Sequence, residues 1–144
     1  MTAITQNIAT WDQIYCSESQ FEKQYSIATE SMPAENPEWE KCTSSLEEIW
    51  RDPSLLEDPR PNLQTIQKVI CWLYYLRKIF PYNPPSCIIP EPTGGIIVDF
   101  RTKPAGGKEI IYEFTFCNDR KPEYTEYLDG RIQMMSEMGE YPPK

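Results

Sequence analysis

The chain has 144 residues, and its 14 basic and 22 acidic residues give a net charge of −8 without a histidine. The lack of histidine excludes every mechanism that uses an imidazole as base, metal ligand or pH switch. The acidic balance argues against direct nucleic-acid binding through a basic surface. A chain of this length is expected to form one domain with a modest core.

The sequence contains no sign of membrane insertion or export. No apolar run approaches the roughly 20 residues that a membrane helix needs. The first residues lack the basic start and apolar stretch of a signal peptide. We therefore predict a cytoplasmic protein with no membrane contact.

The charge is unevenly distributed along the chain. Residues 1–61 hold 12 acidic and 4 basic residues, whereas residues 62–144 hold 10 of each. We predict a flexible tail over residues 1–9, followed by an acidic helical part over residues 10–61. Mostly helical spacing of apolar residues predicts a first helix over about residues 11–29.

A second helix is expected before residue 53. Two overlapping capping boxes, one beginning at Ser44 and the other at Ser45, predict its start. Pro53 disfavours helical geometry at the preceding residue and should end the helix.

The strongest helical pattern follows Asn62, which predicts an N-cap. Apolar residues then recur at the spacing of one helix face until Pro81 ends the pattern. The residues in this stripe are Leu63, Ile66, Val69, Ile70, Leu73, Leu76 and Phe80.

After Pro81 the apolar period changes from 3.6 to 2, which is typical of half-buried strands. Gly94-Gly95 and Asp129-Gly130 predict hairpin turns. The expected strands cover residues 86–90, 96–101, 110–117, 123–128 and 131–135, and the tail after Met138 is expected to fray.

Together these elements predict a single α+β domain over residues 10–144. In it, N-terminal helices precede one long amphipathic helix that packs on a four- to five-stranded antiparallel meander. The helix and the sheet occupy residues 62–138.

The proline-led helix, the "Pro-Glu-Pro-Thr-Gly-Gly-Ile-Ile-Val-Asp-Phe" segment that ends at Phe100 and the later strands resemble a group of small uncharacterised bacterial proteins. The resemblance covers about residues 46–135. It implies an α+β fold of the kind just described, and a link to defence-associated genes, but no established activity.

The five cysteines are widely spaced. No pair has the short spacing of a zinc knuckle or a redox dithiol, and the odd number argues against a complete disulfide framework. We predict that most are small buried apolar residues and that the protein needs no metal and no cofactor. They are Cys16, Cys42, Cys71, Cys87 and Cys117.

Catalysis has one candidate pair, the acidic residues Asp99 and Glu113 on adjacent predicted strands. Two such carboxylates are typical of metal-dependent hydrolases of the nuclease type. The lysine expected two residues after the second acid is replaced by Thr115. Both acids fall on the polar faces of their strands, so we expect solvent exposure and no catalytic residue.

Binding of a protein partner is the leading functional prediction. The acidic first half is rich in aromatic residues, which dominate interface hot spots. The residues predicted to bind a partner are Trp11, Tyr15, Phe21, Tyr25, Trp39 and Trp50.

The chain is thus predicted to be a non-enzymatic interaction module that uses this acidic half or an open sheet edge. A homodimer through a sheet edge is one form of this prediction. One alternative is an acidic inhibitor or antitoxin-like protein that imitates nucleic acid and blocks a basic target. The other alternative is the metal-dependent hydrolase.

Overall fold

The computed structural model describes residues 14–16, 37–104 and 106–143. Two α-helices, a 3₁₀ helix and six strands lie in these ranges, and none of the helices is long and apolar enough to cross a bilayer. The elements are β1 (Tyr15–Cys16), α3 (Pro37–Arg51), η1 (Pro53–Leu55), α4 (Leu63–Ile79), β2 (Cys87–Glu91), β3 (Gly95–Thr102), β4 (Ile110–Cys117), β5 (Glu123–Leu128) and β6 (Arg131–Glu137).

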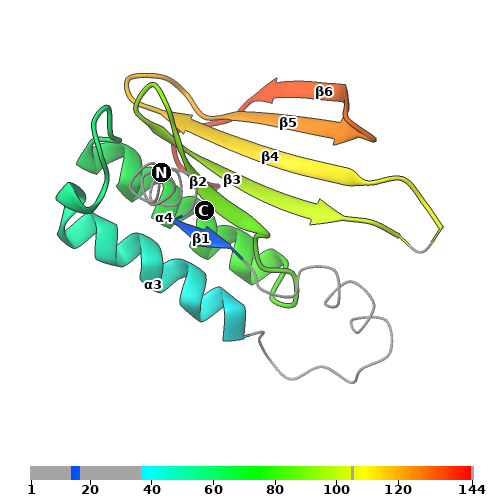
Figure 1. The fold of residues 1–144 in the computed structure, drawn as a ribbon, viewed down its shortest axis with the longest axis horizontal. Helices are drawn as coiled ribbons and strands as arrows, with labels where there is room; N and C mark the ends of the chain where they lie inside the picture. The colour runs from blue at the N-terminus through cyan, green and yellow to red at the C-terminus, as the bar shows by residue number, and fades with distance from the viewer. Residues whose placement is uncertain (1–13, 17–36, 105, 144) are drawn as a thin grey trace, which may run out of the picture.

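The fold is α+β, as the sequence predicts. The six strands form one antiparallel sheet in the order β1-β2-β3-β4-β5-β6, with α3 and α4 on one side of it (Figure 1). The sheet has one strand more than the four or five expected, because β1 adds to the β2 edge. The last strand also continues to Glu137, two residues beyond its predicted end.

The predicted helix over residues 11–29 is wrong at Tyr15 and Cys16. These two residues form β1 and pair with Ile88 and Cys87 of β2. The pairing is a long-range contact that overrides a weak local helical pattern. Ile14 is not helical either, since its N–H donates to the Ile88 carbonyl at 2.7 Å, and the remaining residues of that prediction lie outside the described part of the chain.

The start of α3 also differs from the prediction. The helix begins at Pro37, which fits the first turn because its missing N–H is not needed there. Glu38 and Glu40 in that turn interact favourably with the helix dipole. Ser45, predicted as a cap, lies inside the helix and its hydroxyl donates to the Lys41 carbonyl at 2.9 Å. The end at Arg51 agrees with the predicted stop.

Helix α4 follows the sequence pattern closely. The Asn62 side chain accepts a hydrogen bond from the Thr65 backbone N–H at 2.8 Å, which confirms the predicted N-cap. The helix ends at Ile79, and the Phe80 N–H bonds back to the Leu76 carbonyl at 2.7 Å.

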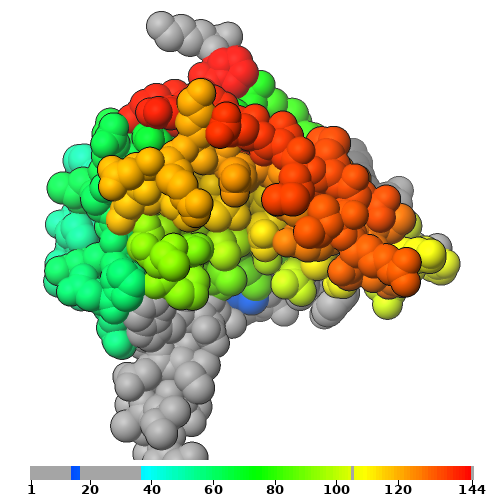
Figure 2. Space-filling model, turned by 90° about the horizontal axis from the view of Figure 1, so that it is seen from above, coloured from blue at the N-terminus to red at the C-terminus, as the bar shows by residue number. Residues whose placement is uncertain are grey.

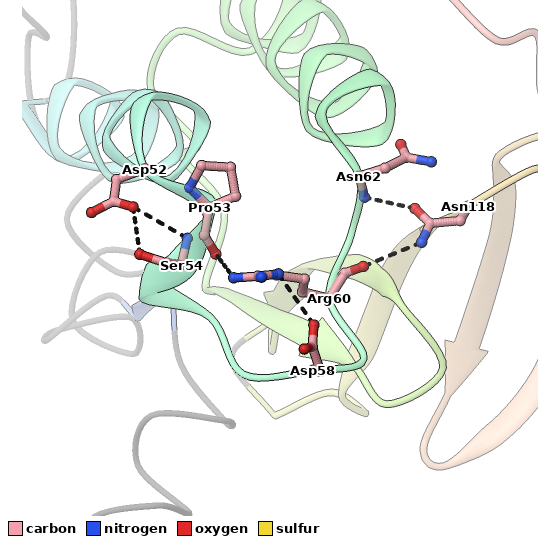
Figure 3. Close-up of polar contacts among 7 residues, drawn as sticks. All are labelled: Asp52, Pro53, Ser54, Asp58, Arg60, Asn62 and Asn118. Atoms are coloured by element: carbon pink, nitrogen blue, oxygen red, sulfur yellow. Dashed lines mark hydrogen bonds and ion pairs between the residues drawn. The ribbon is translucent and has the colours of Figure 1, made fainter.

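Asn118, at the end of β4, fastens the start of α4 to the sheet (Figure 3). Its Oδ1 accepts from the Asn62 N–H at 2.9 Å and from the Thr65 hydroxyl at 2.7 Å. Its Nδ2 donates to the Arg60 carbonyl at 3.2 Å. The Arg60 side chain in turn reaches the Pro53 carbonyl of η1 at 3.2 Å, so one chain of bonds links η1, α4 and the sheet.

The core lies between the helices and the sheet face that carries Ile96, Val98 and Phe100. The Trp39 ring of α3 lies 6.2 Å from the Phe100 ring, and its Nε1 donates to the Phe80 carbonyl at 2.9 Å. Trp39 is fully buried, which accounts for its polar atom having a partner. Side chains packed here also include Leu46, Ile66, Val69, Leu73, Ile88 and Phe116.

The residues after Met138 pack against α4 instead of fraying. The Trp72 Nε1 donates to the Gly139 carbonyl at 3.3 Å. The buried Lys68 side chain forms an ion pair with Glu140 at 3.3 Å. The prediction of a frayed tail is therefore wrong over the part of it that the structure describes.

Candidate functional site

Two surfaces outside the core hold candidate functional residues. The first is a transverse row of residues on the sheet face opposite to the helices, which we call the outer row. Its members are direct pairing partners on successive strands. They are Cys16, Cys87, Asp99, Glu113, Thr125 and Met135.

Asp99 is the most buried acid of the outer row. Only 4% of its surface is exposed, so the predicted solvent exposure is wrong. Arg101 approaches its Oδ2 at 3.4 Å, whereas no described residue forms a hydrogen bond with Oδ1. Burial raises the pKa of the Asp99 carboxyl, and the charge and hydrogen bond of Arg101 oppose this rise.

Glu113 lies directly opposite Asp99 and is partly buried. Its Oε1 accepts a hydrogen bond from the Tyr127 hydroxyl at 3.3 Å. Burial raises the pKa of the Glu113 carboxyl, and the nearby Asp99 raises it further, while Tyr127 and Arg101 lower it. Both carboxyl groups therefore bind protons more readily than usual. The Arg101 guanidinium is the cation that opposes this effect at both of them.

The acid pair meets only part of what a hydrolytic metal site needs. Adjacency of Asp99 and Glu113 is confirmed by the strand register. Within residues 14–16, 37–104 and 106–143, no group of three or more His, Cys, Asp or Glu side chains could hold a metal ion. The hydrolase alternative thus gains no further ligand from the described residues.

The cysteines divide into two kinds. Cys42 and Cys117 are buried, as predicted for small apolar residues. Cys16 and Cys87, partly buried at one end of the outer row, bring their sulfur atoms to 2.9 Å. Sequence spacing gave no indication of this contact, because 71 positions separate the two residues.

The second surface is the β6 edge of the sheet. All seven residues of β6 are exposed, and among the described strands β6 pairs with β5 alone. The exposed fractions of its apolar side chains are 55% for Ile132, 48% for Met134 and 61% for Met135. Figure 2 looks onto this region, where the orange-red residues of β6 lie at the surface.

The aromatic residues predicted to bind a partner are found in different environments. Tyr15 and Trp39 are buried in the core, and Trp50 is 46% exposed. Trp11, Phe21 and Tyr25 lie outside the described residues. The structure therefore brings Tyr15 and Trp39 into packing contacts, and their role in an interface stays a prediction.

Several acids of α3 are engaged within the chain. Glu38 accepts from the Tyr15 hydroxyl at 2.6 Å, and Glu40 pairs with Arg77 at 2.9 Å. Glu47 accepts from the Tyr74 hydroxyl at 2.7 Å. These contacts leave α3 less available as an acidic binding surface than its sequence suggests.

No protein-family model, curated protein or solved structure matches the chain.

Proposed function

We propose that the protein is a binding module that accepts an extended segment of a partner protein along β6. The observation that carries this proposal is the exposure of all seven β6 residues on a strand at the sheet edge. An edge strand offers backbone donors and acceptors to an incoming strand, which is the basis of β-strand addition.

The register of β6 indicates which backbone groups are available. The Met138 N–H donates to the Pro122 carbonyl at 2.8 Å, one step beyond the paired residues Glu123 and Glu137. Hydrogen-bonded and non-hydrogen-bonded residue pairs alternate along two antiparallel strands. The backbone groups of Met135 and Glu137 are therefore expected to point away from β5.

The side chains of β6 favour a partner of definite chemistry. Met134 and Met135 are neighbours in the strand and lie on opposite faces, so an incoming strand finds apolar surface on both sides. Glu137 lies directly opposite Glu123, an arrangement of like charges that is unfavourable unless a cation is near. We therefore expect a segment with alternating apolar residues and a Lys or Arg beside Glu137.

Selection from a display library of random peptides, followed by Kd measurement on synthetic peptides, tests this proposal. We expect enriched peptides to combine apolar residues with a basic residue and to shift the amide resonances of β6. Met135→Pro removes an outward N–H while leaving the β5 ladder intact, and should weaken binding at least tenfold. Met135→Thr keeps the N–H and the strand preference, and should weaken binding less.

If the wild type and Met135→Pro bind the peptides equally well, the proposal that the partner binds along β6 is contradicted. If that binding also disappears at moderate salt, the acidic helical surface and the inhibitor alternative gain support. A concentration-dependent dimer that Met135→Pro converts to monomer would identify a second copy of this chain as the occupant of β6.

A further inference from the structure

Cys16 and Cys87 lie directly opposite each other in the pairing of β1 with β2, at the sheet edge remote from β6. Their Sγ atoms are 2.9 Å apart and not covalently bonded. Paired residues of antiparallel strands have Cα atoms about 4.5–5.5 Å apart, a distance that a disulfide spans without backbone movement. Bond formation requires the sulfurs to approach by less than about 1 Å.

We propose that Cys16 and Cys87 are a redox-active pair that oxidises to an intramolecular disulfide and fastens β1 to β2. Hydrogen peroxide is a sufficient oxidant. The thiolate of one cysteine of the pair attacks one peroxide oxygen and releases hydroxide, which gives a sulfenic acid. The sulfur of the other cysteine then attacks the sulfenic sulfur, the S–O bond breaks, and the proton of the attacking thiol leaves with the hydroxyl as water. Two thiols lose two electrons, and one peroxide is reduced to two waters.

The surroundings of Cys87 favour its protonated thiol. Cys16 faces it from β1, and Asp99 and Arg101 face it from β3. Burial, then the contact with Cys16, raises the pKa of Cys87 to about 12, against the opposing charge of Arg101. Cys87 is therefore a thiol at neutral pH, and the 2.9 Å contact places the two sulfurs to close the disulfide once one of them has been oxidised.

The remaining cysteines are placed less favourably for this reaction. Cys42 and Cys117 are buried in α3 and β4, where a soluble oxidant has little access. Cys71 lies within α4 and has no sulfur contact among the described cysteines. Oxidation under mild conditions should therefore select the Cys16–Cys87 pair.

The disulfide would also stabilise the whole fold. It would close a chain segment between positions 71 residues apart, which restricts the unfolded chain. It would hold β1, a strand of only two residues, on the β2 edge. We expect the oxidised protein to melt on the order of 10 °C above the reduced protein.

The test is oxidation of the full chain with a small excess of hydrogen peroxide, followed by intact mass and non-reducing peptide mapping. We expect the loss of two hydrogens, a cross-linked peptide pair that contains Cys16 and Cys87, and the rise in Tm, all reversed by dithiothreitol. Cys16→Ser and Cys87→Ser should each abolish the cross-link, and the matched control Cys71→Ser should keep it.

A cross-link between other cysteines, or between two chains, would overturn the proposal. So would stable sulfenic or sulfinic acid at Cys16 or Cys87 without a cross-link between them. Because the decisive readout is made on the wild type, it does not depend on the folding of the variants, and it is independent of any partner bound at β6.

Discussion

Asp99 of β3 lies directly opposite Glu113 of β4, and burial raises the pKa of both carboxyl groups. Like charges in directly paired positions destabilise a sheet. Here they share one nearby guanidinium, and the Asp99 Oδ1 has no hydrogen-bond donor among the described residues. The outer row therefore contains a charge arrangement that costs stability at neutral pH, and this cost is measurable.

Asp99→Asn should raise the free energy of unfolding at pH 7 by about 1 kcal/mol, because it removes a buried negative charge but keeps an acceptor for Arg101. A raised pKa in the folded state means that the folded protein binds more protons than the unfolded chain at mildly acidic pH. The wild type should therefore gain stability as pH falls towards 3.8, the ordinary pKa of an aspartate side chain, and the advantage of the variant should shrink.

Urea denaturation at several pH values measures this difference. Asp129→Asn is the matched control, because Asp129 is exposed in the β5–β6 turn with a φ of 52° that Asn also adopts. A destabilised Asp99→Asn protein at pH 7 would show that the Asp99 charge is favourable in its place.

Asn118 is expected to be one of the most important polar side chains for stability. Asn118→Ala removes two acceptor contacts and one donor contact at the start of α4, and should cost about 2 kcal/mol. Asn118→Asp keeps both acceptors close to a helix N-terminus and should cost less. Thermal unfolding compares them, with Asn83→Ala at an exposed position as control. Equal losses for the two Asn118 variants would contradict the assigned role of its oxygen.

Gly95 is required by the close approach of β3 and β4. A Cβ at this position would lie 2.3 Å from the Phe116 carbonyl oxygen and 3.0 Å from the Cys117 Cα, both backbone atoms. Gly95→Ala should therefore cost at least about 3 kcal/mol or prevent folding. A Cβ at Gly139 would lie 3.4 Å from its nearest neighbour, the Tyr141 carbonyl oxygen, which is an ordinary contact distance. Gly139→Ala should therefore leave the Tm almost unchanged. Circular dichroism melts distinguish the two, and a folded Gly95→Ala protein of normal Tm would refute the close approach.

Local patterns were sufficient to predict α4 and the strands from β2 to β6. The Asn62 cap, the 3.6-residue stripe and the Gly94-Gly95 turn act over a few residues, so they can be read from one stretch of sequence. The start of α3 was not predicted, because the capping boxes at Ser44 and Ser45 favoured a later start, although proline also fits a first helical turn.

Long-range contacts account for the features that the sequence patterns did not predict. The bonds of Asn118 to Arg60, Asn62 and Thr65 join residues more than 50 positions apart. The pairing of Cys16 with Cys87 and the burial of Asp99 likewise depend on strands brought together by the fold. The alternating sequence pattern predicts that a polar residue such as Asp99 is exposed to solvent. Only the three-dimensional structure shows that it is buried.

Tyr15 is the anchor that holds β1, and with it Cys16, against the sheet. Its ring is buried with 7% exposed, and its hydroxyl donates to Glu38 of α3 at 2.6 Å. Tyr15→Phe removes only the hydrogen bond and should cost about 1 kcal/mol. Tyr15→Ala also removes the buried ring and should cost about 3 kcal/mol or more.

The two Tyr15 variants should differ in peroxide oxidation as well as in stability. With the ring removed, Cys16 is no longer held beside Cys87, so the Cys16–Cys87 cross-link should form several-fold more slowly, while Tyr15→Phe should stay close to the wild type. Quenched-flow alkylation with mass spectrometry measures both rates. Equal rates in Tyr15→Ala and the wild type would mean that β1 is held on the β2 edge by its strand pairing alone.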